Sequence, residues 1–232
     1  MERVKLTISD GTVMEAVVAR SGSVEAPGLL VLQEAFGVNQ HIRNVAERYA
    51  KFGFTAIAPE LFHRTAPPGW EGSYGDFEAI RPHSAALTPQ GLIADMRAAY
   101  EWLTNEAKVV PQRIAAVGYC MGGRCAYLAN SELPLAAAVS YYGGGIAPDL
   151  LDRASKQHAP ILMFWGGLDQ HITPEHYRAV ADALTAAGAD HTQVVFSKAD
   201  HGFNCDVRPS YNESASREAL ALVLEFFRVR VL

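Results

Sequence analysis

Short apolar runs alternate with amphipathic stretches along most of this sequence, and this alternation constrains the fold more than any other feature. Runs of strand length occupy residues 28–32, 54–58, 114–118, 136–141, 161–165 and 193–196. Amphipathic stretches of helical period occupy residues 42–52, 91–104, 122–130, 174–187 and 214–228. Repeated strand–helix units predict an α/β fold, in which a mostly parallel sheet is covered by helices on both faces.

The N-terminal residues have a different pattern. Residues 4–8 alternate between apolar and polar side chains, Asp10-Gly11 follows, and residues 13–19 are rich in β-formers. An Asp-Gly pair between two such segments predicts an antiparallel hairpin. No linker or internal repeat divides the remaining chain, so we expect one domain over residues 1–232.

Residues 61–88 interrupt the alternation. They are rich in proline and glycine and show no clear period. Loops this long are usually functional lids or disordered segments. Trp70, Tyr74 and Phe77 argue against disorder, because aromatic side chains are scarce in disordered segments. We expect a lid-like loop, called the lid segment below.

Composition excludes several classes of function. The chain has 20 basic and 25 acidic residues, a net charge of −5, and 49% hydrophobic residues, which is ordinary globular composition. This charge gives no reason to expect a nucleic-acid partner. No apolar stretch reaches the roughly 18 residues of a membrane helix, and the N-terminus shows no targeting signal. We expect a cytoplasmic protein with no membrane partner, and its modest size favours a monomer.

The three cysteines are Cys120, Cys125 and Cys205. They are too few for a disulfide scaffold, and their spacing lacks the C-x₂-C pairs of a zinc site. The stretch from His171 to His176 does not match the H-E-x-x-H zinc motif. We therefore expect no metal and no cofactor. A low, odd count of cysteines indicates a reducing compartment and raises the question of a functional thiol.

Gly118–Gly122 has the pattern G-x-C-x-G and lies between a predicted strand and a predicted helix. This is the nucleophile-elbow pattern with cysteine as the nucleophile. The glycines let the strand and helix approach closely, while the strained turn exposes Cys120 and directs the N–H of Met121 at an oxyanion. The helix N-terminus also favours a thiolate. The alternative is a tight turn holding a buried cysteine. We expect Cys125 and Cys205 to be packed side chains.

An acid and a histidine follow later strands in the order that elbow enzymes use. Asp169 comes after residues 161–165, and His201 comes after the last strand. In a parallel sheet the carboxyl ends of these strands form the edge at which ligands bind. We predict Cys120 as nucleophile, His201 as general base and acid, and Asp169 as the group that orients His201. Taken singly, a turn aspartate and a solvated histidine are the simpler explanations. Asp206 is a weaker alternative acid. Asp200 is adjacent to His201 in sequence, and adjacent side chains rarely bond in the geometry of a triad.

Together these residues resemble the dienelactone hydrolase family of α/β-hydrolases. The matching motifs span nearly the whole chain and are QEAFGVN at 33–39, APELF at 58–62, GYCMGG at 118–123, GGLD at 166–169 and HGF at 201–203. The resemblance implies the α/β-hydrolase fold and a Cys120–His201–Asp169 triad. It also implies hydrolysis of an enol-lactone such as dienelactone.

The same resemblance assigns two residues of the loop after residues 28–32. Glu34 resembles the family glutamate that contacts the resting cysteine and helps to generate the thiolate. The alternative for Glu34 is a solvated loop acid. The backbone N–H of Ala35 is expected to be the second oxyanion donor beside that of Met121, because the hole takes one N–H from this loop.

The substrate end departs from the family pattern. Family members that act on carboxylated lactones hold the carboxylate with arginines, whose planar fork suits it. Arg208 lies farther from His201 than that pattern has it, Arg81 lies in the lid segment, and Arg64 follows a family-like string. Phe36 is a further candidate for substrate contact. Because surface arginines are usually just solvated, a related lactone, ester or thioester stays open as the substrate.

The sequence thus predicts a hydrolase of small lactones or esters that works through an acyl-cysteine. Two other classes of function stay open. One is a redox or electrophile-sensing protein that uses Cys120 with Cys125 or Cys205. The other is a binding module that keeps the fold and has lost turnover.

Overall fold

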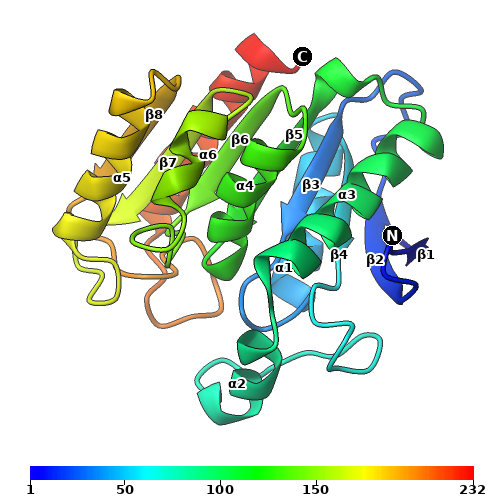
Figure 1. Cartoon of the computed structure of the whole chain (residues 1–232), viewed down its shortest axis with the longest axis horizontal. Coiled ribbons are helices and arrows are strands. Elements are labelled where there is room, and N and C mark those ends of the chain that lie inside the picture. The colour runs from blue at the N-terminus through cyan, green and yellow to red at the C-terminus, as the bar shows by residue number, and fades with distance from the viewer.

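One eight-stranded sheet runs through the computed structural model, which describes residues 1–232 (Figure 1). The strands are β1 Glu2–Thr7, β2 Val13–Ala19, β3 Gly28–Leu32, β4 Thr55–Pro59, β5 Ile114–Tyr119, β6 Ala137–Tyr141, β7 Ile161–Gly166 and β8 His191–Phe196. Their order is β1-β2-β4-β3-β5-β6-β7-β8. β1 pairs antiparallel with β2, β2 pairs antiparallel with β4, and all other pairs are parallel. The predicted hairpin and the mostly parallel sheet are confirmed.

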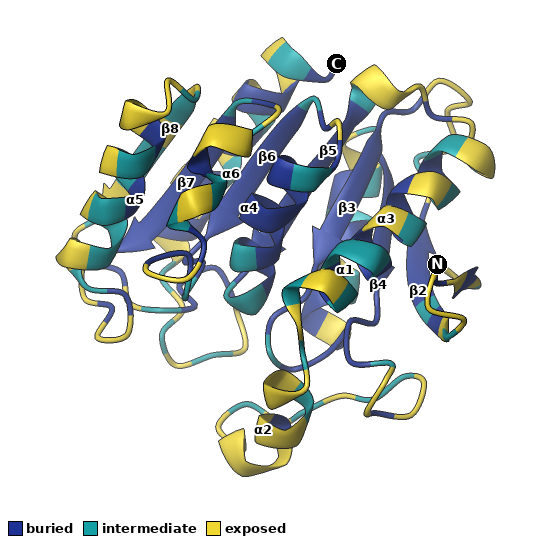
Figure 2. Cartoon of the chain, viewed as in Figure 1, coloured by how far each residue is buried: buried dark blue, intermediate teal, exposed yellow.

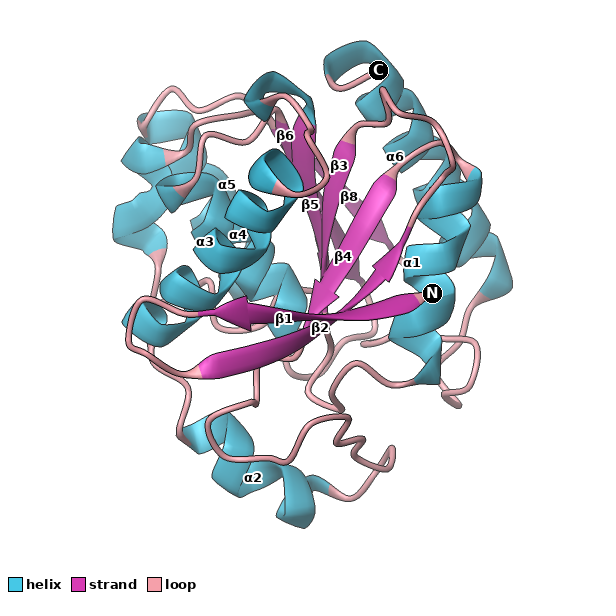
Figure 3. Ribbon diagram, turned by 90° about the vertical axis from the view of Figure 1, so that its right-hand side faces the viewer, coloured by secondary structure: helices cyan, strands magenta, loops and turns pink.

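Helices cover both faces of the sheet, as predicted. They are α1 Gln40–Lys51, α2 Phe77–Ala85, α3 Pro89–Asn105, α4 Met121–Glu132, α5 Pro174–Ala186 and α6 Glu213–Arg230, with short 3₁₀ helices at Pro111–Arg113 and Leu151–Lys156. α3, α4 and α5 lie on one face, and α1 and α6 lie on the other (Figure 3). None of these helices is both long enough and apolar enough to span a membrane.

Burial follows position in the sheet (Figure 2). Every residue of β3, β4, β5, β6 and β7 is buried. Strands covered by helices on both faces need continuous apolar sequence, which is why they are visible in the sequence as apolar runs. The edge strand β8 is only half-buried and starts at His191, two residues before its predicted start, because polar residues on an edge strand leave no apolar signal.

The lid segment contains α2, a helix that the sequence analysis did not predict. Pro82 lies inside this helix, and Ile80 is its one buried residue, so it has little apolar periodicity. The Asp76 side chain caps it by accepting a hydrogen bond of 3.2 Å from the backbone N–H of Ala79. α2 lies beyond the carboxyl edge of the sheet (Figure 1).

Arg64 ties the lid segment to α3 rather than facing a substrate. Its Nη1 and Nη2 donate to the two carboxylate oxygens of Asp95, each over 2.8 Å, and Nη2 also donates to Asp10 over 2.7 Å. The Asp95 side chain is fully buried and also lies 3.1 Å from Nε2 of His63. Bidentate pairing of this kind fixes a guanidinium in place. Arg64 is therefore not the substrate arginine that its motif suggested.

Candidate active site

The predicted elbow joins β5 to α4, with Cys120 as the single residue between them. Cys120 has φ of 56° and ψ of −116°, a backbone conformation that is strained for any residue other than glycine. A Cβ atom on Gly118 would overlap the carbonyl oxygen of Gly122, and one on Gly122 would overlap that of Leu32. Glycine is thus required on both sides of the nucleophile position, as the motif predicted.

His201 joins the other two predicted triad residues in one chain of contacts. Its Nε2 lies 3.1 Å from Sγ of Cys120, and its Nδ1 lies 2.7 Å from Oδ2 of Asp169. The other oxygen of Asp169 accepts from the backbone N–H groups of His171, over 2.8 Å, and Ile172, over 3.0 Å. These bonds fix the carboxylate, so it can orient the imidazole.

The surroundings of His201 favour its charged form. Burial alone lowers the pKa of an imidazole, but the hydrogen bonds with Asp169 and with Cys120 outweigh it and raise the pKa of His201 to about 10. Burial opposes ionisation of Asp169 too, yet the contact with His201 holds the pKa of its carboxyl below the usual value. The imidazole is therefore a strong acceptor for the thiol proton.

The competing acids do not reach the imidazole ring. Asp200 accepts a hydrogen bond of 2.6 Å from the backbone N–H of His201. Asp206 has an exposed side chain that lies 3.3 Å from Nδ1 of His41. Asp169 is thus the only carboxylate in contact with the His201 ring.

The two backbone N–H groups predicted as oxyanion donors, those of Ala35 and Met121, have no acceptor within the protein. Met121 opens α4, and N–H groups in a first helical turn have no acceptor within the helix. The N–H of Ala35 likewise donates to no group of the protein. The assignment of these two groups as oxyanion donors stays a prediction.

Glu34 is completely buried, so the alternative of a solvated loop acid is wrong. Its Oε2 accepts a hydrogen bond of 3.2 Å from the hydroxyl of Tyr74, and its Oε1 lies 3.5 Å from Nη1 of Arg208. No hydrogen bond joins Glu34 to Cys120. In this arrangement Cys120 pairs with His201, while Glu34 pairs with Arg208.

Tyr74 carries the lid segment into this cluster, a role that no sequence signal indicated. Its hydroxyl accepts from Nδ2 of Asn39 over 2.9 Å and from Sγ of Cys205 over 3.2 Å. Cys205 is buried, as expected, and burial raises the pKa of its thiol to about 11. Side chains from three distant parts of the sequence therefore meet beside Glu34.

One group of potential metal ligands lies in the same place. Ligand atoms of Glu34, His41 and Cys205 lie within 4.8 Å of one another. A guanidinium already lies next to the Glu34 carboxylate. Since a metal ion is repelled by a neighbouring cation, this set does not suit a metal.

The predicted substrate-binding residues occupy different environments. The Arg208 guanidinium lies over the rings of Phe36 and Tyr74, with Cζ 5.8 and 5.9 Å from the ring centroids. Phe36 is buried and packs at 4.4 Å, centroid to centroid, against Tyr74. Arg81 is exposed on α2 and forms no ion pair. Arg208 and Phe36 are thus part of the Glu34 cluster, whereas Arg81 is not.

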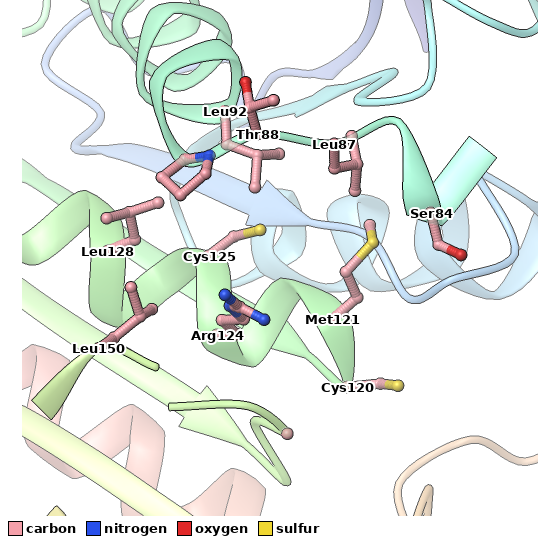
Figure 4. Close-up of a pocket in the computed structure, with 12 residues that line it drawn as sticks. Ser84, Leu87, Thr88, Leu92, Cys120, Met121, Arg124, Cys125, Leu128 and Leu150 are labelled. Carbon is pink, nitrogen blue, oxygen red and sulfur yellow. The ribbon is translucent and has the colours of Figure 1, made fainter. Parts of the chain in front are cut away.

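A cavity of about 320 Å³ opens beside the candidate nucleophile (Figure 4). Residues from the lid segment, α3, α4 and the loops after β6 line it, and most of them are apolar. They are Ser84, Leu87, Thr88, Pro89, Leu92, Cys120, Met121, Arg124, Cys125, Leu128, Gly144 and Leu150.

A cysteine at a strained turn between a parallel strand and a helix, followed along the chain by an acid and a histidine at the same sheet edge, defines an α/β-hydrolase. The model of the dienelactone hydrolase family matches residues 14–230. The chain belongs to this family, and it is a hydrolase of the dienelactone hydrolase type.

Relatives and solved structures agree with this assignment. A protein of Synechocystis, provisionally named carboxymethylenebutenolidase, is 34% identical over 88% of this chain and 87% of its own length. A protein of Escherichia coli K12 with the same provisional name is 34% identical over 95% of this chain and 84% of its own length. The crystal structure of a Klebsiella pneumoniae protein, provisionally named dienelactone hydrolase, superposes with a TM-score of 0.88 at 31% identity, covering 98% of both chains.

Proposed function

We propose that this chain hydrolyses small esters or lactones through a thiolate of Cys120 and an acyl-cysteine intermediate. One observation carries the proposal. Asp169, His201 and Cys120 form an unbroken line of contacts of 2.7 and 3.1 Å at a strained elbow. A nucleophile bonded to a base that is itself oriented by an acid is the general signature of covalent catalysis.

Each step is assigned to groups of this chain. His201 takes the thiol proton, and the Cys120 sulfur forms a bond to the substrate carbonyl carbon, whose oxygen becomes an oxyanion held by the N–H groups of Ala35 and Met121. The carbonyl re-forms as the bond to the leaving oxygen breaks, and that oxygen takes the proton from His201. His201 then removes a proton from water, whose oxygen attacks the thioester. The acid leaves, and Cys120 regains its proton.

Glu34 is proposed to help to generate the thiolate. Complete burial and an Oε1 atom that accepts no hydrogen bond support this role. With Glu34 held by Tyr74 and Arg208, Cys120 pairs with His201, which is the pairing that attack requires.

The most specific substrate that we propose is an enol-lactone of the dienelactone type. An enolate leaving group stays tethered after ring opening and can help to return the proton. The second candidate is a related carboxylester or thioester without a carboxylate, and the engagement of Arg208 by Glu34 favours it. For a lactone that carries a carboxylate, Arg208, Arg81 and Phe36 are the proposed substrate contacts.

A thiol-based redox function is the less favoured alternative. Burial raises the pKa of Cys125 to about 12 and that of Cys205 to about 11, so neither forms a thiolate readily. A nucleophilic Cys120 nevertheless needs to stay reduced, which fits the proposed cytoplasmic location.

The test compares wild type with Cys120→Ala and His201→Ala on p-nitrophenyl acetate and on a panel of carboxylated and neutral lactones. His191→Ala, at the start of edge strand β8, is the matched control. Wild type and the control turn over at least one of these compounds, while the two site variants lose at least about 10³-fold in kcat/KM. Full activity in Cys120→Ala, or no turnover of any ester or lactone by wild type, overturns the proposal.

A further inference from the structure

The cavity beside Cys120 runs along one face of α4 (Figure 4). Cys120, Met121, Arg124, Cys125 and Leu128 line it, with the spacing of residues that share a helix face. Leu128 follows Cys120 by eight positions, which is about 12 Å along a helix axis. The cavity is therefore elongated, with the candidate nucleophile at one end.

The lining suits an uncharged apolar group. Leu87 and Leu92 line it from the lid segment and α3, and Leu150 lines it from the loop after β6. Arg124 is its one charged residue, and the guanidinium lies 3.4 Å from Asp149 with 30% of the side chain exposed. The guanidinium is thus paired with Asp149 and solvated, while the aliphatic stem of Arg124 adds to the apolar wall.

The position of His201 shows which part of a substrate this cavity faces. In the proposed mechanism the leaving oxygen takes its proton from Nε2 of His201, so the leaving group lies on the histidine side of Cys120. His201 does not line the cavity, whereas Cys120 and the oxyanion donor Met121 do. The cavity therefore extends from the acyl side of the reacting carbonyl.

Resting on the proposed function, we propose that this cavity is an acyl-chain subsite, and that the chain acts on esters, thioesters or alkyl-substituted lactones whose acyl part carries an extended, uncharged aliphatic arm. Burying one methylene group stabilises a complex by about 0.8 kcal/mol, which is a factor of about four. Lengthening the arm raises kcat/KM by this factor until the arm reaches Leu128 and Leu150 at the far end.

The experiment measures kcat/KM for the p-nitrophenyl esters of acetic, butanoic, hexanoic, octanoic and dodecanoic acids. All five share one leaving group, so differences report the acyl arm alone. In wild type, kcat/KM rises about fourfold per methylene from acetate to a maximum at hexanoate or octanoate and falls at dodecanoate. A flat or steadily falling series overturns the proposal.

Variants locate the effect. Leu128→Phe fills the far end, and Leu150→Phe, which fills the same end from the loop after β6, is a second variant if the first fails to fold. Each lowers kcat/KM for octanoate at least about tenfold and leaves acetate within about threefold. Leu222→Phe, on the exposed face of α6, changes neither. Equal losses on acetate and octanoate in a folded variant overturn the assignment.

A binding measurement separates the two proposals. Octanamide, an uncharged carbonyl compound, binds wild type at least about tenfold more tightly than acetamide by calorimetry, and Leu128→Phe removes the difference. Tight octanamide binding without any ester turnover overturns the proposed function and keeps the subsite. Turnover of p-nitrophenyl acetate without any preference for longer acyl chains or for octanamide overturns the subsite and keeps the proposed function.

Discussion

Replacing Asp169 by asparagine isolates what the carboxylate gives to His201. Asparagine has the same shape, and its amide oxygen can still accept the backbone N–H groups of His171 and Ile172, which now donate over 2.8 and 3.0 Å. Its NH₂ group, however, takes the place of the oxygen that lies 2.7 Å from Nδ1. A donor there forces the proton of a neutral imidazole onto Nε2, the nitrogen that must accept the thiol proton.

The magnitude follows from the pKa of His201, which is raised from 6.5 to about 10. A shift of that size is worth about 5 kcal/mol of imidazolium stabilisation, and the Asp169 hydrogen bond is the largest contribution that raises it. Losing the part of this stabilisation that Asp169 supplies lowers kcat/KM by about 10³- to 10⁴-fold, the loss expected when the acid of such a triad is replaced by its amide. The contacts of the loop backbone persist, so we expect little change in the unfolding temperature.

The pH profile gives a second readout with a definite sign. His201 must be protonated to deliver a proton to the leaving group, so activity falls as pH rises through its pKa of about 10. Removing Asp169 lowers this pKa toward 6.5, and the alkaline limb of kcat/KM therefore moves to lower pH.

Asp200→Asn is the matched control, because it removes the same charge one residue from His201 while contacting only the backbone. Stopped-flow or steady-state hydrolysis of p-nitrophenyl acetate from pH 5 to 11 measures both variants. The kcat/KM of the control stays within about fivefold of wild type. The reasoning is refuted if Asp169→Asn lowers kcat/KM less than about tenfold, if both variants lower kcat/KM equally, or if the alkaline limb of the pH profile does not move.

Three further changes test the scaffold around the site. Arg64→Ala leaves the fully buried Asp95 carboxylate without its guanidinium partner and lowers the free energy of unfolding in urea by about 3–5 kcal/mol; a loss below about 1 kcal/mol contradicts this. Tyr74→Phe removes the hydroxyl that donates to a buried Glu34 oxygen and costs about 1–3 kcal/mol in the same assay, so unchanged stability would show that another donor replaces it. Gly122→Ala places a methyl group on the Leu32 carbonyl, so we expect little folded protein by circular dichroism, and a wild-type spectrum argues against the close approach.

The strands and the three triad positions could be predicted because each leaves a local signal. Buried parallel strands require continuous apolar sequence, and a tight strand–helix turn requires glycines at fixed offsets from the nucleophile. Parallel strands end at one edge, so Cys120, Asp169 and His201, each in a loop after such a strand, had to lie near one another. The structure adds the contact distances, which depend on side-chain rotamers and loop paths.

The surroundings of Glu34 left no such signal. Tyr74 and Arg208 approach it from the lid segment and from the loop after His201, and pairings between irregular segments produce no periodicity in the sequence. α2 was missed for a related reason, since a helix with one buried residue and an internal proline has no apolar stripe to detect. Both belong to the lid or its contacts, where tertiary packing decides the conformation.

The arginines considered as carboxylate ligands bear on which substrates this site favours. Arg64 is held by Asp95, and Arg208 lies 3.5 Å from a fully buried Glu34 with 16% of its own side chain exposed. A carboxylated substrate that bound Arg208 would compete with Glu34 for the same guanidinium and would place a second carboxylate in a desolvated pocket. Like charges at close range in such surroundings are strongly unfavourable. A neutral ester avoids this cost, because it leaves the Glu34–Arg208 pair intact and needs only the oxyanion donors and the apolar cavity along α4.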